Sequence, residues 1–533
     1  MKKTKKCVCG ILAACLAAST LLAGCGNGGG TTEEVGDISK YPMQTDVKLT
    51  YWLPLDTMTS ATAANLGDTP FAKELLKQTG ANVEFQHPAA GQESEKLNLM
   101  IASNELPDII MNDWYAYPGG AQKAVGDEVI LPLNDLMDDG TIVNLKQYYS
   151  ENPDIDKMAK TDEGTYYCFP FIRGDETLLV SAGPMVRADW LEELNLSVPE
   201  TMDDWYNMLV KFRDEKGAQA PLSFLLNNLK TMNPFIGAYG IAREYYVDGN
   251  EIKYGPAQPE YKEFLATFQK WYSEKLLDNN IATIDNKILD TNMLTGKTGA
   301  SVAYAGSGLD KWMSATSEGK AENYRLVGTP YPVLEKGQKA EFGAYSLPYV
   351  SSGSAAITTA CKYPQVAAKF LDFAYGEEGK LLYNFGVEGE SYNMVDGYPT
   401  YTDKVLHNEE GLTKTNALMR YIRAAGSGPF VQDKRYLEQY YEREEQTQAI
   451  DLWVNTNAES HAVPTISATE EESSELAKLT NAIDTYVSET FLQFIMGIKP
   501  LSEFDSYVSE LRNKGIDRVL EIKNAQYKRY QTR

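Results

Sequence analysis

The feature that most constrains the fold is an alternation of strand-like and helix-like segments between residues 47 and 111. In chain order it comprises a strand at 47–55, a helix from Asp68-Thr69-Pro70 to Gly80, a strand at 82–86, a helix at 93–102 and a strand at 108–111. Strands that alternate with helices imply a parallel sheet with right-handed crossovers. In such sheets a ligand lies beyond the carboxyl ends of the strands. We therefore predict an α/β fold with a binding edge at the ends of these strands.

The amino-terminal segment has the order of a secretory signal. Four lysines among the first six residues precede an apolar run over 11–23, which is shorter than the about 20 residues of a membrane-spanning helix. The sequence Leu-Ala-Gly-Cys at 22–25 resembles a bacterial lipobox, which implies cleavage before Cys25 and lipidation of its sulfur. The alternative is an ordinary signal peptide with an incidental cysteine. Residues 26–45 are rich in glycine and then polar, as expected of a flexible tether.

Composition excludes several classes of function. The formal charge of −24 argues against nucleic acid as a partner, because phosphates require a basic surface. The three histidines lie far apart and no Cys/His cluster has the spacing of zinc ligands, so we expect no metal and no cofactor. Beyond the signal and Cys25, only Cys168 and Cys361 remain, and at most one disulfide can form. No later apolar run reaches the about 18 residues that a membrane span needs.

Further helices are predicted after residue 185, and the C-terminal third is predicted to be mostly helical. The predicted helices cover 186–194, a segment from Thr201, a segment from Pro259, 364–375 and 502–530. Thr201 and Asp204 fit a capping box. An aromatic stripe that includes Tyr261, Phe264 and Phe268 has helical spacing, which is typical of a core-facing helix. The small-residue segment 303–308 is predicted to be a loop.

Four segments spread over nearly the whole chain carry a resemblance to a known family. They are Ala-Ser-Asn-Glu-Leu-Pro-Asp-Ile-Ile at 102–110, Val-Arg-Ala-Asp-Trp-Leu at 186–191, Gly-Val-Glu-Gly-Glu-Ser-Tyr at 386–392 with Tyr-Thr-Asp at 401–403, and Phe-Ile-Met-Gly at 494–497. In this order they resemble the extracellular solute-binding proteins of carbohydrate ABC transporters, in the large lipoprotein subgroup of Gram-positive bacteria. The resemblance implies a two-lobed, periplasmic-binding-protein-like α/β fold with several hinge crossings and a sugar held between the lobes.

The resemblance also implies a division of the chain. The expected parts are a signal peptide at 1–24, a lipidated cysteine and tether at 25–45, an N-lobe at 46–168 plus 327–356, and a C-lobe at 169–326 plus 357–533. Some relatives carry a calcium loop after the helix that follows the Asp-Trp-Leu motif. Here the matching region, 212–220, has too few spaced oxygen ligands, and we expect no metal there.

By this resemblance the chain is a receptor and not an enzyme. We expect a monomer on the extracellular face of the cell membrane, attached through its lipid anchor only, that closes on an oligosaccharide and delivers it to the permease subunits of an ABC transporter. The alternative is a secreted glycan-active hydrolase, which needs two carboxylates about 5–10 Å apart; no local motif nominates such a pair. An adhesin or structural protein of the cell wall is a third possibility.

A sugar site needs flat rings against the C–H face of the sugar, and carboxylates or amides for its hydroxyls. The candidate ligand-binding residues lie at strand ends, in loops or in the family motifs, and are Trp52, Asp56, Asn112, Asp113, Trp114, Tyr115, Arg173, Glu176, Asn233, Tyr304, Trp312, Glu388, Tyr392 and Trp453. Each has a structural alternative. Asn112 and Asp113 could cap a turn, Arg173 and Glu176 could form a surface ion pair, and Glu388 could bond backbone amides.

Overall fold

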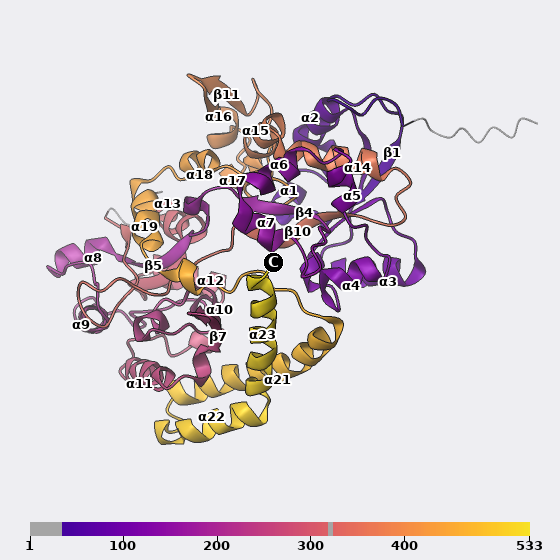
Figure 1. The fold of residues 1–533 in the computed structure, drawn as a ribbon. Helices are drawn as coiled ribbons and strands as arrows, with labels where there is room; N and C mark the ends of the chain where they lie inside the picture. The colour runs from indigo at the N-terminus through magenta and orange to yellow at the C-terminus, as the bar shows by residue number, and fades with distance from the viewer. Residues whose placement is uncertain (1–34, 318–322) are drawn as a thin grey trace, which may run out of the picture.

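The computed structural model describes residues 35–317 and 323–533. The predicted signal peptide and Cys25 lie outside the described residues. Among the described residues, no helix has both the length and the apolar composition that crossing a membrane requires. The described residues form a six-stranded sheet, a three-stranded sheet and two two-stranded sheets, which are β6 (Tyr245–Asp248) with β7 (Glu251–Tyr254) and β11 (Tyr392–Val395) with β12 (Tyr398–Tyr401). The two larger sheets and a layer of long helices organise the molecule (Figure 1).

The first lobe, as we call it, is built on a six-stranded sheet in the order β13-β4-β10-β3-β1-β2. Its strands are β1 (Lys48–Trp52), β2 (Asn82–Gln86), β3 (Ile109–Asn112), β4 (Phe169–Arg173), β10 (Tyr349–Ile357) and β13 (Val431–Gln432). β1 runs parallel to β2 and β3, β13 runs parallel to β4, and β10 lies antiparallel between β3 and β4. Five strands therefore end at the edge where β10 begins, and the predicted α/β fold is confirmed.

Local signals position the helices between the first strands. Helix α2 (Pro70–Thr79) begins after Thr69, whose hydroxyl accepts a hydrogen bond from the amide of Ala72, and it ends at Gly80 with φ of 70°. Only glycine adopts this left-handed conformation without strain. Helix α3 (Glu93–Ser103) follows β2. The predicted start and stop of the first helix, and the existence of the second, are confirmed.

Further helices cover the six-stranded sheet. They are α1 (Thr57–Ser60), α4 (Gly120–Gly126), α5 (Asn134–Asp138), α6 (Asn144–Glu151), α7 (Pro153–Ala159), α14 (Pro364–Asp372) and α15 (Glu377–Phe385). Phe370 of α14 and Phe385 of α15 are buried in the same core as the strands. The expected division placed everything after residue 356 in the other lobe. The structure instead packs the segment 364–436 against this sheet, because the apolar faces of its helices cover the sheet.

The second lobe contains a three-stranded sheet, β8-β5-β9, with β5 (Ala182–Arg187) antiparallel to both β8 (Ala300–Tyr304) and β9 (Leu326–Gly328). The helix predicted from Val186 is wrong at its start: Val186 pairs with Ala300 and Val327 in the sheet, and α8 begins at Ala188. This strand is buried along its whole length, which hides the alternating pattern that marks a half-exposed strand.

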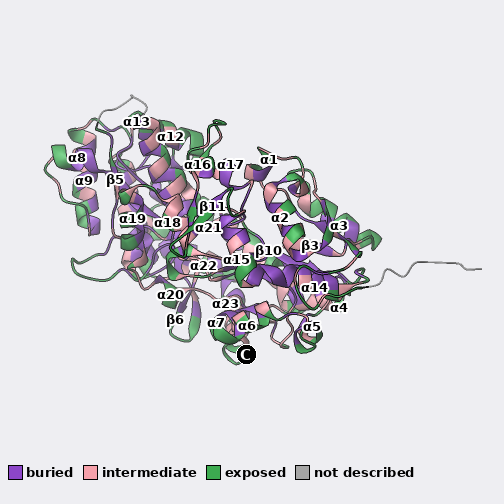
Figure 2. Ribbon diagram, turned by 90° about the horizontal axis from the view of Figure 1, so that it is seen from above, coloured by how far each residue is buried: buried purple, intermediate pink, exposed green. Residues whose placement is uncertain are grey.

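Helices surround this second sheet. They are α8 (Ala188–Glu193), α9 (Met202–Asp214), α10 (Leu226–Met232), α11 (Glu260–Ser273), α12 (Asn286–Leu294), α13 (Lys311–Ser317) and α19 (Glu444–Val454). The capping box of Thr201 and Asp204 at the start of α9 is confirmed. The aromatic stripe on α11 is buried, as predicted. Figure 2 shows buried residues inside both lobes and exposed residues on the outer helices.

The chain passes between the two sheets several times. It leaves the first lobe after β4 through 174–181, returns through 329–348 to β10, and leaves again after β13 through 433–443 to α19. Three helices, α21 (Glu470–Ile495), α22 (Phe504–Asn513) and α23 (Ile516–Gln531), then form a layer below both sheets in Figure 1. The predicted helix over 502–530 is two helices, α22 and α23, with Gly515 between them at φ of 97°.

Candidate ligand-binding site between the lobes

A cavity of about 440 Å³ lies at the carboxyl edge of the six-stranded sheet. This volume is within the range of small-molecule pockets, about 300–1,000 Å³. The described residues that line it are Tyr115, Arg173, Ser346, Leu347, Tyr349, Val350, Ser351, Val463, Pro464, Thr465, Ile466 and Lys523. They come from the sheet edge, from the crossing that leads to β10, and from the segment and helix of the α21–α23 layer. The cavity therefore lies where the topology of a parallel sheet predicts a ligand.

Arg173, a predicted site residue, is the last residue of β4 and lines this cavity. Its Nη1 donates a hydrogen bond of 3.2 Å to the carbonyl of Leu347, while Nε and Nη2 bond no described residue. Burial lowers the pKa of this guanidinium, and the electrostatic interaction with the nearby Tyr304 opposes that shift. The structure shows no ion pair between Arg173 and Glu176, which is exposed at the start of a short 3-10 helix in the first crossing.

Tyr304 brings the second lobe to the same region. It is the last residue of β8, beside Ala182 at the start of β5, where the first crossing enters the second sheet. Its side chain is 47% exposed. Tyr304 is near enough to Arg173 to influence the pKa of the guanidinium, but it is not among the described residues that line the cavity.

Tyr115 links the first lobe to the segment before α21. Its hydroxyl donates a hydrogen bond of 2.6 Å to the carbonyl of Ile466, and 37% of the residue stays exposed. Burial raises the pKa of this hydroxyl to about 12, against the opposing charge of Arg533. Its neighbour Asp113 accepts a hydrogen bond from the amide of Ala116, so the capping alternative is confirmed for Asp113. Asn112 pairs with Ser354 of β10 at the end of β3 and is half-buried.

Lys523 of α23 is a cavity residue that sequence reasoning missed. Its Nζ lies 4.5 Å from the ring centre of Tyr245, and no described residue bonds or pairs with it. Burial lowers its pKa, while the charges of Glu244 and Asp484 oppose that shift. Nothing in the local pattern of 502–530 distinguishes this lysine from the others on the same helices, because its position depends on the docking of α23.

Three predicted indoles lie in the core. Trp114 is 0% exposed, and its Nε1 donates to the carbonyl of Ile110. Trp312 donates to Asp290, and Trp453 to the carbonyls of Pro184 and Thr329. An indole buries a large apolar area and needs only one hydrogen-bond acceptor. Each of these three indoles has apolar surroundings and an acceptor inside the protein. We therefore reassign these three indoles from the site to the core.

The other candidates do not line the cavity. Trp52 is buried beside a separate cavity of about 730 Å³ that only first-lobe residues line. Asp56 caps α1 and pairs with Arg423 at 3.3 Å. Asn233, with φ of 47°, accepts a hydrogen bond from the amide of Arg243. Glu388 is exposed, and Tyr392 is buried against Phe385. The last two belong to the turn and hairpin of β11 (Tyr392–Val395) and β12 (Tyr398–Tyr401).

Cys168 and Cys361 are free and buried thiols. Burial raises the pKa of each to about 12, so both stay protonated at neutral pH. In the described ranges, no group of three or more His, Cys, Asp and Glu side chains is arranged to hold a metal ion.

Two lobes joined by repeated crossings, with a cavity at the edge of one sheet, define the class of two-lobed solute-binding proteins. Residues 60–381 match the family of bacterial extracellular solute-binding proteins, and the chain belongs to that family. It is 23% identical over 477 residues to lipoprotein LipO of Bacillus subtilis (strain 168), covering 86% of this chain and 89% of LipO.

Two further relatives extend this similarity. The chain is 24% identical over 501 residues to the fructooligosaccharide ABC transporter substrate-binding protein FusA of Streptococcus pneumoniae, covering 86% of each protein. Its fold is similar to that of the alginate-binding protein AlgQ2, with a TM-score of 0.71, 22% identity, and coverage of 93% of this chain and 100% of AlgQ2. The similarity thus extends over both lobes.

Proposed function

We propose that this chain is the substrate-binding protein of an ABC transporter that captures an oligosaccharide on the extracellular face of the cell membrane. The observation that carries the proposal is the cavity at the junction of the lobes, which combines hydroxyls, rings and free cationic donors. Membership of the solute-binding family supports capture and delivery, and the relative FusA is named for a fructooligosaccharide. On this proposal Cys25 carries the lipid anchor, the protein acts as a monomer, and the permease subunits receive the sugar.

Capture works by closing the lobes. Arg173 is on the first lobe and Tyr304 is on the second, so a sugar that contacts both stabilises the closed state. The crossings 174–181 and 329–348, and residues 441–443 after α18 (Lys434–Tyr440), are the segments that would bend, because they connect the two sheets. We therefore place the hinge in these crossings, with the segment 364–436 moving with the first lobe.

Capture is favoured over hydrolysis of the sugar. A glycosidase needs two carboxylates about 5–10 Å apart around the bond that it cleaves. The described residues that line the cavity include no Asp and no Glu. The cavity can therefore donate hydrogen bonds to a sugar, but its walls lack the acid and the base that would cleave it.

The proposal is tested with protein that begins after Cys25 and a panel of oligosaccharides. A ligand at 100 times its Kd adds about 2.7 kcal/mol to the free energy of unfolding, which a thermal shift detects, and chromatography shows whether the sugar is recovered intact. Turnover of the sugar, or no binding to any member of the panel, contradicts the proposal.

Tyr304→Ala serves as the site variant in this test. We expect at least tenfold weaker binding with little change in thermal stability, because the ring is exposed. Tyr398→Ala is the control, since Tyr398 lies in the β11–β12 hairpin and, unlike Tyr304, has no electrostatic effect on Arg173. In cells, Cys25→Ser should move the protein from the membrane fraction to the medium.

A further inference from the structure

The walls of the inter-lobe cavity carry charge of one sign only. Arg173 and Lys523 are the only charged residues among the described residues that line it, and the others are Tyr, Ser, Thr, Leu, Val, Pro and Ile. This is unexpected for a chain with 74 acidic residues against 50 Lys and Arg. Because carboxylates are in excess in the chain as a whole, their absence among the described residues that line this cavity bears on the charge of the ligand.

Neither cation forms a salt bridge with a carboxylate of the described residues. Arg173 uses one nitrogen for the carbonyl of Leu347, and its other nitrogens bond no described residue. Lys523 is held over the ring of Tyr245 and forms no ion pair within the described chain. The acids whose charges act on Lys523 are Glu244 and Asp484. Glu244 is itself paired with Lys230 at 3.2 Å, and neither acid lines the cavity.

Leaving partly buried cations without a counter-charge has a cost. Burial lowers the pKa of both groups, which means that each charged form is less stable here than in water. A ligand anion would remove that cost when it binds. The planar fork of an arginine matches the two oxygens of a carboxylate, and an ammonium adds a point charge.

We infer that the sugar captured in this cavity is acidic, with a carboxylate held between the Arg173 guanidinium and the Lys523 ammonium. This inference rests on the proposed function and names the ligand class. Arg173 ends a strand of the first lobe, whereas Lys523 lies on α23. The carboxylate therefore contacts both sides of the cavity, and the hydroxyls of Ser351 and Thr465 on the cavity wall remain for the neutral part of the sugar.

The test compares acidic oligosaccharides with their carboxyl-reduced counterparts of the same length and linkage. The probes are oligomers of galacturonate, glucuronate, mannuronate and guluronate, each paired with its reduced form, measured by calorimetry on the protein that begins after Cys25. We expect an acidic oligosaccharide to bind at least 30-fold more tightly than its reduced form. Higher salt should weaken only the acidic ligand, because charge pairs are screened.

Charge-removing variants then assign the effect to the two cations. Arg173→Gln and Lys523→Gln should each weaken binding of the acidic sugar at least tenfold and leave any binding of the reduced sugar unchanged. Lys528→Gln is the matched control, because Lys528 is exposed on the same helix. Thermal unfolding of every variant checks that the fold is intact.

Each outcome decides the inference. Tighter binding of acidic sugars that depends on both cations supports it. Equal binding of acidic and reduced sugars, or binding that the two variants leave unchanged, overturns the acidic ligand and keeps the proposed function. No binding to any acidic or neutral oligosaccharide overturns both proposals.

Discussion

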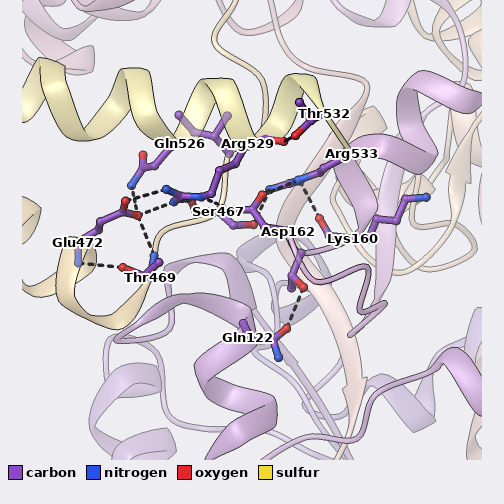
Figure 3. Close-up of polar contacts among 12 residues, drawn as sticks. Gln122, Lys160, Asp162, Ser467, Thr469, Glu472, Gln526, Arg529, Thr532 and Arg533 are labelled. Carbon is purple, nitrogen blue, oxygen red and sulfur yellow. Dashed lines mark hydrogen bonds and ion pairs between the residues drawn. The ribbon is translucent and has the colours of Figure 1, made fainter.

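Two pairs of cations lie at the junction of the lobes, and their surroundings are opposite. Arg529 donates to Asp162 at 2.7 Å and to Glu472 at 2.6 Å, and Arg533 donates to the same Asp162 at 2.8 Å (Figure 3). Arg173 and Lys523 have no carboxylate partner in the described chain. Lys523 and Arg529 lie on the same helix, α23. The protein therefore neutralises one pair fully and leaves the other free.

The difference between the two pairs of cations indicates two roles, which are holding the lobes together and binding a ligand. The Arg529–Arg533 cluster joins α23 to Asp162 of the first lobe and to Glu472 at the start of α21. Arg533 adds hydrogen bonds of 2.7 Å to the carbonyl of Lys160 and to Ser467, and its side chain is 3% exposed. A cluster with internal partners holds parts of the protein together. Cations without such partners are available to a ligand.

The largest effect is expected for Asp162→Asn. The change removes the shared partner of Arg529 and Arg533 and leaves a nearly buried cation uncompensated, which costs about 3 kcal/mol. Urea unfolding measures this loss in the free energy of unfolding. A loss below about 1 kcal/mol would mean that the cluster is not what holds α23 to the first lobe.

Two substitutions on α23 are expected to have intermediate effects on the free energy of unfolding, and the two effects should have opposite signs. Arg529→Met breaks paired hydrogen bonds and should lower the free energy of unfolding by about 2 kcal/mol. Lys523→Met removes a desolvated charge that has no partner, and should raise it by about 1 kcal/mol. Thermal unfolding at pH 7 compares the two. The comparison fails if both variants are destabilised equally.

The Lys523→Met gain also has a pH dependence. The folded-state pKa of Lys523 is lowered below 10.5, so the unfolded chain binds its proton more tightly. The unfavourable contribution of Lys523 is present below the folded-state pKa and is lost as pH rises toward 10.5. The advantage of Lys523→Met should therefore shrink as the pH is raised, which repeated unfolding experiments measure.

A smaller effect is expected for Glu472→Gln. Burial raises the pKa of this carboxyl. The hydrogen bonds and the charge of Arg529, together with the amide of Thr469, lower the pKa by more than burial raises it, so the pKa lies below 4.5. Its stabilising contribution is therefore present above pH 4.5 and is lost as pH falls through the lowered pKa. The free energy of unfolding of the wild type should exceed that of the variant by about 1 kcal/mol at neutral pH. Unfolding measured at decreasing pH should show the two free energies converging.

The smallest effect is expected for Arg518→Ala on the same helix. Arg518 pairs with Glu475 and Glu521 at the surface, where solvent and salt screen the charges. We expect no measurable change in the unfolding midpoint at physiological salt. A loss as large as that of Asp162→Asn would show that the number of ion pairs, rather than their burial, governs stability here.

The elements of the first lobe were predictable because their signals are local. Strand β2 occupies the predicted residues, and the limits of α2 follow from the hydroxyl of Thr69 and the left-handed Gly80. The start of α8 was misplaced because Val186 and Arg187 lie in a strand that is buried throughout. Apolar runs of this kind do not distinguish a buried strand from a helix.

The site was only partly predictable. Strand ends in a parallel sheet share one edge, which is why Tyr115 was selected. Arg173 was selected because it follows the expected first crossing, and it was expected on the other lobe, whereas the structure places it at the end of β4 in the first lobe. Both residues line the cavity. The reasoning from strand ends also selected Trp114, which the structure buries completely. Trp453 was selected as a ring platform, yet it packs so closely on Gly183 that a side chain on that glycine would overlap the indole. Whether an aromatic ring is buried or exposed depends on segments that are far from it in the sequence.

The sequence by itself determined the family, the alternating start of the first lobe and the edge at which we propose that a ligand binds, because caps, periodicity and strand order act over short stretches of chain. Only the tertiary structure decided which rings are buried, that 364–436 packs with the first sheet, and that Lys523 meets Arg173 at one cavity. The physical reason is that burial and charge pairing depend on neighbours hundreds of residues away, and no local pattern records them.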